Sequence, residues 1–277
     1  MTPNDFTPAA VAAWAADYIG ANNTVRGHVS AIRNFLRWCE ETGNLTRYRD
    51  RPMQRILRSY PPTYGKVQSH RPANRLDAAG YTALIAACQD GSDAGLRDEL
   101  MVRLGVSGGM RVNELRTLTV AGLLTAPDLR WTGKAKKQRT AKAGPELVAL
   151  IDRYLIRYAE AIGGQEPRPS SPALCATLHP RNPSAVAWGQ PVRQNDTLSR
   201  NLRKRANAAG LGWMAAHDLK RTAGRMMHEA RSADGGHLFD LLDIADVLDH
   251  DNPKVTKDCY IGPLGSENKD RAAALFG

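Results

Sequence analysis

Residues 22–43 of the sequence read NNTVRGHVSAIRNFLRWCEETG, and this stretch sets the expected fold class. Its apolar residues recur three and four positions apart, which is the period of one face of an α-helix. These residues are Val25, Val29, Ile32, Leu36 and Cys39. Gly43 follows the last turn, where a glycine commonly ends a helix. A long amphipathic helix is therefore predicted near the start of the chain.

The same helical period governs most of the remaining sequence. It predicts further helices within residues 7–20, 52–58, 78–88, 96–109, 145–163, 196–210, 212–230 and 239–250. Short β-like pieces flank a turn rich in Gly and Lys in residues 129–144, which predicts a small hairpin. Residues 163–190 are rich in proline and follow neither period, so a loop is predicted there. The expected fold class is mostly α with a small β-sheet.

The first predicted helix, within residues 7–20, has a start signal and an apolar side. Thr7 is in position to cap the helix, and Pro8 suits its first turn. The spacing of Val11, Trp14 and Tyr18 places all three on one side. This stretch is therefore predicted to be a helix.

Residues 61–75 separate two regions of helical sequence. The stretch SYPPTYGKVQSHRPAN (residues 59–74) combines proline, glycine and polar residues without a helical or strand period, as linkers between domains do. We therefore expect a small helical domain over residues 1–60, a basic linker over 61–75 and a larger domain over 76–277.

The charge of the chain points to a polyanionic partner. The formal net charge is +10, and residues 1–75 carry 11 Lys or Arg against 5 Asp or Glu. Because neutralised phosphates release condensed counterions, nucleic acid is the first candidate partner and an acidic membrane surface only a distant second. The candidate DNA contacts are arginines of two predicted helices: Arg26, Arg33, Arg37, Arg200 and Arg203. A merely solvated surface is the alternative interpretation of these arginines.

Several classes of protein do not fit the sequence. It has no run of about 18 apolar residues and no basic stretch followed by an apolar one at its start. We therefore expect neither a membrane span nor a secretory signal, and a cytoplasmic location. Cys39, Cys88, Cys175 and Cys259 are scattered without a CxxC pair, which favours reduced thiols. A Walker-type loop and clustered carboxylates are also absent from the sequence, so no nucleotide, metal or other cofactor is expected.

Four short stretches concentrate side chains that can act on a phosphate. GMRVNELRTL (109–118) places Arg111 near the start of a helix, with Glu114 one turn later and close enough to hold the guanidinium. GKAKKQR (133–139) places three lysines around the predicted hairpin turn. HDLKRT (217–222) brings an imidazole, a carboxylate, two cations and a hydroxyl into under two helical turns. VLDHDNPKVTKDCYIG (247–262) puts His250 at a helix end and Tyr260 ten residues later.

In this order, the four stretches resemble the motifs of the tyrosine recombinase (phage integrase) family of site-specific recombinases. That family carries G-x-R-x-x-E-L, a hairpin turn like GKGxKxR, H-x-L-R, and L-G-H followed by a tyrosine. The corresponding stretches here are GMRVNEL, GKAKKQR, HDLK and LDH with Tyr260. Residues 23–38 also look like part of the family's core-binding domain. The resemblance implies a helical core-type DNA-binding domain over 1–60, and over 76–277 a mixed α/β catalytic domain with a C-terminal tail.

The resemblance also implies strand cleavage by transesterification without a cofactor. Tyr260 would attack the scissile phosphate, forming a 3′-phosphotyrosyl link and freeing a 5′-hydroxyl. His217 would accept the phenolic proton, and Lys134 would protonate the departing oxygen, with Lys136 and Lys137 as the alternative lysines of the same turn. Arg111, a second cation and His250 would stabilise the charge that develops on the pentavalent phosphorane.

Three positions depart from the family pattern. Lys220 stands where the family has its second Arg, and an ammonium lacks the two-pronged geometry of a guanidinium. Arg221 follows directly but lies about 100° further round the helix, so the two remain alternative candidates for the second cation. Asp249 replaces the glycine of L-G-H and adds a carboxylate near the phosphate site, while Ala135 replaces a glycine of the hairpin turn. Slower or more regulated cleavage is expected.

The function expected from the resemblance is site-specific DNA recombination, as in prophage or mobile-element integration and excision in a bacterial host. Two alternatives remain: a catalytically weakened DNA-binding regulator on the same scaffold, and a relaxation enzyme like the type IB topoisomerases.

The expected partner is double-stranded DNA with core-type recombination sites. Four protomers are expected on two duplexes, with a Holliday-junction intermediate, and a monomer or weak oligomer when free. A directionality factor is a further candidate partner. Only six residues precede Thr7, so we expect no additional arm-site domain. The apolar end of the tail, residues 272–276, is expected to dock on a neighbouring protomer.

Overall fold

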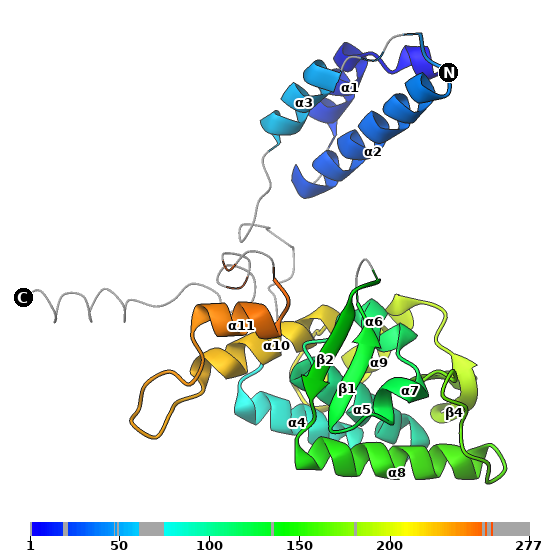
Figure 1. The fold of residues 1–277 in the computed structure, drawn as a ribbon, viewed down its shortest axis with the longest axis vertical. Helices are drawn as coiled ribbons and strands as arrows, with labels where there is room; N and C mark the ends of the chain where they lie inside the picture. Colours follow the sequence, from blue (N-terminus) through cyan, green and yellow to red (C-terminus); the bar gives the residue numbers. More distant parts are fainter. Residues whose placement is uncertain are drawn as a thin grey trace, which may run out of the picture. The chain divides into compact units, whose positions relative to one another are not determined.

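The computed structural model describes residues 2–18, 22–46, 48, 50–60, 75–133, 136–179, 182–250, 253 and 256. The chain divides into two compact units, Met1–Pro72 (unit 1) and Ala73–Gly277 (unit 2), and each is described by itself (Figure 1). Most of the regular structure is helical in both units. The predicted fold class, mostly α with small sheets, is therefore confirmed.

Unit 1 is a three-helix structure preceded by one 3-10 turn, Pro3–Asp5. Its helices are α1 (Pro8–Asp17), α2 (Asn22–Glu41) and α3 (Asp50–Ser59). The Thr7 hydroxyl accepts the Ala10 N–H at 3.2 Å, which confirms the predicted cap of α1. Gly43 has a φ of 75°, a left-handed conformation that glycine adopts without a steric cost. The sequence thus places both the first helix start and the α2 stop correctly.

The core of unit 1 lies where the three helices meet. It consists of Val11, Ala15, Val25, Val29, Met53, Ile56 and Leu57. The helix predicted at α1 is confirmed, with Ala15 buried and Trp14 38% exposed. The stripe of α2 continues into a smaller cluster of Leu36, Cys39 and Leu45.

Unit 2 contains eight helices and two hairpins among its described residues. The helices are α4 (Ala78–Cys88), α5 (Asp93–Ser107), α6 (Val112–Thr117), α7 (Val120–Leu123), α8 (Pro145–Ala161), α9 (Asn195–Ala208), α10 (Ala216–Glu229) and α11 (Leu241–Val247). The strands are β1 (Asp128–Thr132), β2 (Gln138–Lys142), β3 (Cys175–His179) and β4 (Asn182–Pro191). None of the helices in the described part of the chain is long and apolar enough to cross a membrane.

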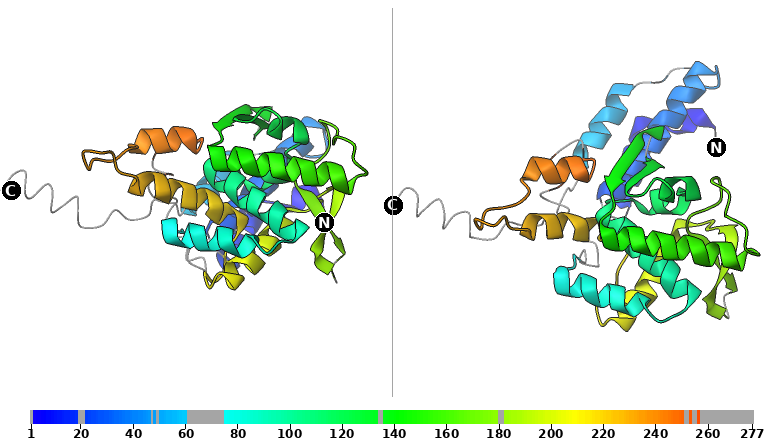
Figure 2. Two further views of the ribbon diagram at one scale, coloured as in Figure 1. Left: turned by 90° about the horizontal axis from the view of Figure 1, so that it is seen from below. Right: turned by 60° about the horizontal axis from the view of Figure 1, so that its bottom comes forward.

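Helix α5 is the centre of unit 2, with α4, α8 and α10 packed around it (Figure 2). Leu100, Met101 and Leu104 on α5 are fully buried. Gly105 lets α10 approach closely, since a Cβ at this position would lie 2.7 Å from Leu219 Cδ1. Because Leu219 belongs to the HDLKRT stretch, α5 sets the position of the polar residues on either side of it.

The predicted hairpin at residues 129–144 is confirmed. Strands β1 and β2 pair antiparallel, with Trp131 opposite Arg139 and Thr132 opposite Gln138. Strand β1 packs against α7, and its Leu129 and Trp131 are buried while the residues between them are exposed. This alternation attaches one face of the hairpin to the core.

The loop predicted at residues 163–190 is confirmed up to residue 174 but wrong beyond it, because the second hairpin begins at Cys175. Strands β3 and β4 pair antiparallel with shifts in register, so neither strand has the clean alternation that sequence analysis needs. Tertiary contacts hold this hairpin instead. Arg97 of α5 donates to the Cys175 carbonyl at 3.3 Å, and the Trp188 ring packs on Tyr154 and Tyr158 of α8.

Candidate active site

Arg111 is positioned by the first turn of α6. It is the N-cap residue, and its backbone N–H donates to Glu114 Oε2 at 2.9 Å while its guanidinium donates to Glu114 Oε1 at 3.2 Å. Glu114 is buried and also accepts the indole N–H of Trp131 at 3.3 Å. One carboxylate therefore holds Arg111 in place and joins α6 to the β1–β2 hairpin.

His217 lies in the first turn of α10, which Asp218 caps. The Asp218 carboxylate accepts the Ala215 N–H at 2.9 Å and the Arg221 guanidinium at 2.7 Å. His217 is half-buried, and its pKa is lowered to about 4 by burial first and then by the cations Arg221, Lys220 and Arg111. The imidazole is therefore neutral at pH 7, the state in which it can accept a proton.

The two alternative cations, Lys220 and Arg221, take different directions. Lys220 is only 1% exposed, and its ammonium donates to the Leu248 carbonyl. Burial, and then the charge of Arg111, lowers the pKa of Lys220 to about 7. Arg221 is more exposed and forms its ion pair with Asp218 on its own helix. Lys220 thus faces the end of α11, whereas Arg221 braces the start of α10.

The end of α11 brings His250 to the same place. The His250 backbone N–H donates to the Ala245 carbonyl at 2.8 Å, and its Nδ1 lies 2.8 Å from Thr256 Oγ1. Arg111 donates to the carbonyl of the preceding residue, Asp249, at 3.3 Å. Arg111 and Lys220 therefore hold two consecutive carbonyls, those of residues 249 and 248, immediately before His250.

The Asp249 side chain lies among several cations. It forms ion pairs with Arg139, with Arg111 at 3.6 Å and with Lys137 at 3.9 Å. Asp249 has a φ of 52°, in the left-handed region where Asp is one of the few tolerated non-glycine residues. Its place in L-G-H is the available sequence signal, because a glycine position often requires such a conformation. The sequence motifs placed the Asp249 carboxylate here and offered Lys137 as an alternative to Lys134, but they gave Arg139 no role.

Two candidate residues, Lys134 and Tyr260, lie outside the described residues, as do Ala135 and the C-terminal tail. The structure therefore brings together Arg111, Glu114, His217, Lys220 and His250 from α6, α10 and the end of α11. Among the described residues, no group of three or more His, Cys, Asp or Glu side chains is placed to hold a metal ion.

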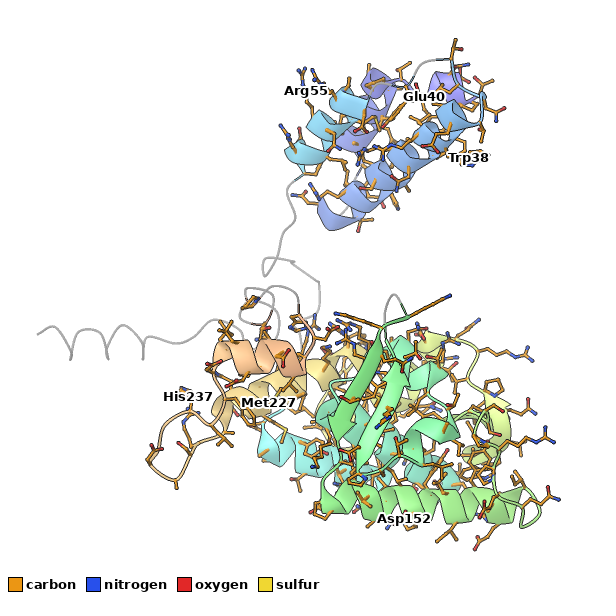
Figure 3. The ribbon with its side chains drawn as sticks, viewed as in Figure 1. Trp38, Glu40, Arg55, Asp152, Met227 and His237 are labelled. Atoms are coloured by element: carbon orange, nitrogen blue, oxygen red, sulfur yellow. The ribbon has the colours of Figure 1, made fainter. Side chains whose placement is uncertain are left out.

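All three arginines predicted on α2 make contacts inside unit 1. Arg26 donates to two backbone carbonyls at the end of α3. Arg33 forms a two-pronged pair with Asp50, the first residue of α3, and Arg37 lies 3.4 Å from the same carboxylate. Trp38 beside Arg37 is 55% exposed and projects from α2 (Figure 3). Arg37 and Trp38 thus keep more of their surface available to a partner.

The two predicted arginines of α9 are partly solvated. Arg200 and Arg203 both pair with Asp196, at 3.3 and 3.1 Å. The Arg203 guanidinium also lies 5.7 Å from the centre of the Trp213 ring. These contacts orient the two side chains along one face of α9, apart from the residues gathered around His250.

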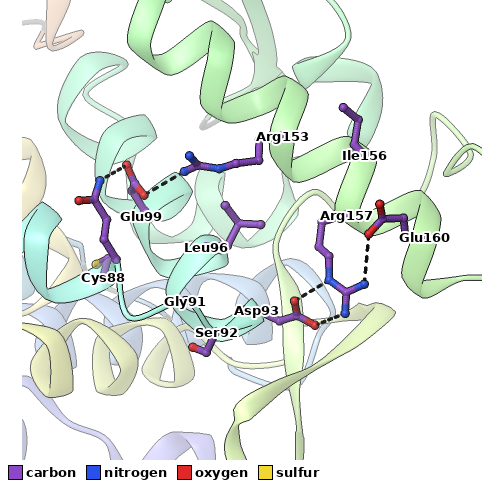
Figure 4. Close-up of a pocket in the computed structure, with 11 residues that line it drawn as sticks. Cys88, Gly91, Ser92, Asp93, Leu96, Glu99, Arg153, Ile156, Arg157 and Glu160 are labelled. Carbon is purple, nitrogen blue, oxygen red and sulfur yellow. Dashed lines mark hydrogen bonds and ion pairs between the residues drawn. The ribbon is translucent and has the colours of Figure 1, made fainter.

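A separate pocket of about 680 Å³ opens between the start of α5 and α8 (Figure 4). Its charged side chains pair with one another: Arg157 with Asp93 at 2.7 Å, and Arg153 with Glu99 at 3.4 Å. None of the described candidate residues lines this pocket. The cluster at the end of α11 is therefore not part of it.

Comparison with known proteins identifies the class of this fold. The structure of XerH site-specific recombinase bound to palindromic difH substrate, a post-cleavage complex, superposes with a TM-score of 0.61 at 16% identity, covering 98% of this chain and 72% of that chain. A lambda integrase(75-356) dimer bound to a COC′ core site gives a TM-score of 0.57 at 17% identity, covering 92% and 81%. The fold is that of the tyrosine recombinases.

The sequence comparisons agree with the fold. Residues 74–264 match the model of the Phage integrase family. Tyrosine recombinase XerD of Xanthomonas campestris pv. campestris is 33% identical over 145 residues, which cover 46% of this chain and 44% of that protein. The matched stretches span about half or less of the curated relatives' own length. The chain belongs to the phage integrase family, as its motifs predicted.

Proposed function

We propose that this protein is a site-specific recombinase that cleaves and rejoins DNA through a 3′-phosphotyrosyl intermediate. The observation that carries the proposal is the pair of contacts from Arg111 and Lys220 to the carbonyls of residues 249 and 248. These contacts gather two cations and His250 from three separate helical segments. Such a group of cationic donors suits the charge that develops on a phosphate during transfer.

In the proposed reaction, the Tyr260 oxygen attacks the scissile phosphorus and the bond to the 5′-oxygen breaks. His217 takes the phenolic proton; its ring is uncharged at neutral pH, because burial and the neighbouring cations lower its pKa to about 4. Lys134 gives a proton to the departing 5′-oxygen. Arg111 and His250 stabilise the phosphorane, and Glu114 orients Arg111. Reversal of these steps by another 5′-hydroxyl rejoins the strand.

We further propose that unit 1 is the core-type DNA-binding domain, joined by the basic linker 61–75 to the catalytic domain. Arg37 supports this role through its exposed guanidinium, and Arg200 and Arg203 supply backbone contacts from unit 2. Core-type sites, a tetramer on two duplexes and a directionality factor complete the proposal. Prophage or mobile-element integration and excision is the biological role that it favours.

Covalent trapping on nicked duplexes tests the proposed chemistry. A pool of duplexes with a random core and a nick at varied positions is incubated with the full chain, because loss of the short 5′ fragment prevents rejoining. The expected product resists detergent and is abolished by Tyr260→Phe, and sequencing of the trapped DNA gives the target site.

The alternatives predict different products in the same experiment. A weakened regulator would retain the selected DNA without a covalent product, and this result would overturn the recombinase proposal. A relaxation enzyme would trap DNA of every sequence and relax supercoiled plasmid. Recombination between two copies of the selected site, seen as exchanged flanks, is the result expected here.

A further inference from the structure

Lys220 does not provide a two-pronged donor for the phosphate. A phosphate undergoing transfer spreads charge over several oxygens, and a planar guanidinium can donate to two of them at once. Lys220 is 1% exposed, and its ammonium is already donated to the Leu248 carbonyl. Lys220 therefore stabilises the end of α11. A second two-pronged donor to the phosphate has to come from another residue.

Arg139 on β2 has the position for this role. It lies opposite Trp131 in the hairpin, and Trp131 bonds to Glu114, the residue that also holds Arg111. The path of the side chain is set by Gly133, where a Cβ would lie 2.9 Å from Arg139 Cγ and 3.0 Å from its Nε. The missing side chain at Gly133 therefore makes room for Arg139.

The two guanidinium groups meet at one oxygen. Asp249 Oδ2 is the atom that pairs with both Arg139 and Arg111, the latter at 3.6 Å, while Lys137 approaches Oδ1 at 3.9 Å. Arg139 also has a buried Nε that finds no hydrogen-bond partner among the described residues. A donor left over in this way indicates that the carboxylate does not use all that the two arginines offer.

We propose that Arg139 is a second phosphate-binding arginine of this site, and that the Asp249 carboxylate occupies the anion position between Arg139 and Arg111 until DNA arrives. This inference rests on the proposed function, since the anion it assigns is the scissile phosphate. A carboxylate and a phosphodiester each carry one negative charge, so one can replace the other between the same two arginines. Asp249 then keeps the arginines close together and competes with DNA for them.

Binding of inorganic phosphate tests the anion site without DNA or catalysis. The Nε–H signals of Arg111 and Arg139 are followed by NMR in the full chain as phosphate is added. Asp249→Asn removes the competing charge and keeps the left-handed conformation, because Asn also tolerates it. We expect Asp249→Asn to bind phosphate at least tenfold more tightly than wild type, and Arg139→Gln in the same background to cancel this gain.

A matched arginine controls for the loss of positive charge. Arg157 pairs with Asp93 in the same unit, away from Asp249, so Arg157→Gln in the Asp249→Asn background should leave the phosphate affinity unchanged. Equal affinity of wild type and Asp249→Asn would overturn the placeholder role. A phosphate affinity that Arg139→Gln leaves unaltered would overturn the role of Arg139.

A second experiment connects the anion to the scissile phosphate. Covalent trapping is compared on the selected duplex with a normal phosphate and with a neutral methylphosphonate at the cleavage point. Arg139→Gln should slow trapping about 100-fold on the phosphate but under threefold on the methylphosphonate, whereas a structural defect would slow both equally and refute the assignment. If no covalent product forms with wild type, the recombinase proposal fails, and the phosphate titration still decides whether Arg139 and Asp249 form an anion site.

Discussion

Asp50 in unit 1 and Asp249 in unit 2 are both carboxylates surrounded by cations, yet their surroundings differ. Asp50 receives two donors from Arg33, one from the Tyr48 hydroxyl at 2.9 Å and a further cation, Arg37. It begins α3 and joins that helix to α2. Asp249 follows a short helix, has a left-handed backbone and leaves a donor of Arg139 unused. A saturated cluster fixes a fold, whereas an unsaturated one retains the capacity to bind another anion.

The largest effect is expected from removing the support beneath Asp249. Lys220→Ala leaves a cavity and an unpaired Leu248 carbonyl, so the free energy of unfolding should fall by about 3 kcal/mol. Arg221→Ala should cost less, about 1 kcal/mol, because the buried Asp218 carboxylate keeps its bond from the Ala215 N–H after the guanidinium is removed. Denaturant unfolding of the full chain measures both. A larger loss of stability for Arg221→Ala than for Lys220→Ala would show that Lys220 is not the cation that holds the end of α11.

Replacing one arginine in each cluster tests most directly whether the Asp50 and Asp249 clusters have different roles. Arg139→Gln should slow covalent trapping about 100-fold and change stability little, since its role is to bind an external anion. Arg33→Gln should instead destabilise unit 1, seen as faster amide hydrogen exchange in α2 and α3, because its two-pronged pair is internal. The reverse pattern, with exchange altered by Arg139→Gln alone, would mean that the Asp249 cluster is the structural one.

Gly133→Ala tests the path of Arg139 without changing any charge. The added Cβ would meet the Arg139 side chain at 2.9–3.0 Å and Glu114 Oε1 at 3.3 Å. We expect trapping to slow about tenfold, as is typical of modest misplacement of a donor. Gly144→Ala is the matched control, because a Cβ there meets nothing within 4 Å. Equal trapping rates for the two variants would show that Gly133 does not set the position of the Arg139 side chain.

The smallest effect is expected for the stabilisation by Asp50, which depends on pH. The Arg33 guanidinium, bonded to Asp50, holds the pKa of that carboxyl well below its usual range. Its contribution to stability is therefore present above about pH 4 and is lost as the pH falls further. Asp50→Asn should lower the free energy of unfolding by about 1 kcal/mol at pH 7, with a smaller difference from wild type at pH 3. A difference that does not depend on pH would show that packing, and not the charge of Asp50, holds α3.

Helices such as α2 and α8 could be predicted because each one buries a stripe with the helical period. In α8, for example, Leu147, Leu150, Ile151, Tyr154 and Tyr158 are all buried. The β3–β4 hairpin could not be predicted, because Arg97 and Trp188 hold it from outside its own sequence. Tertiary contacts of this kind override local preference.

The same distinction applies to the site. The motifs identified Arg111, His217, Lys220 and His250, because each belongs to a short local pattern. The convergence of Arg139 on Asp249 depends on how closely a hairpin approaches a helix end, which no local pattern encodes. The replacement of a glycine by Asp249 was the one visible sign of it.

The contact between Gly105 and Leu219 has a consequence for how this site can vary. Leu219 lies between the capping carboxylate of Asp218 and the buried amine of Lys220, and its side chain rests against the bare backbone of α5. The Leu219 side chain therefore sets how far the His217 imidazole and the Lys220 amine lie from α5. We expect a methyl group at Gly105 to push Leu219 outward and to shift His217 and Lys220 with it, because the added Cβ would lie 2.7 Å from Leu219 Cδ1.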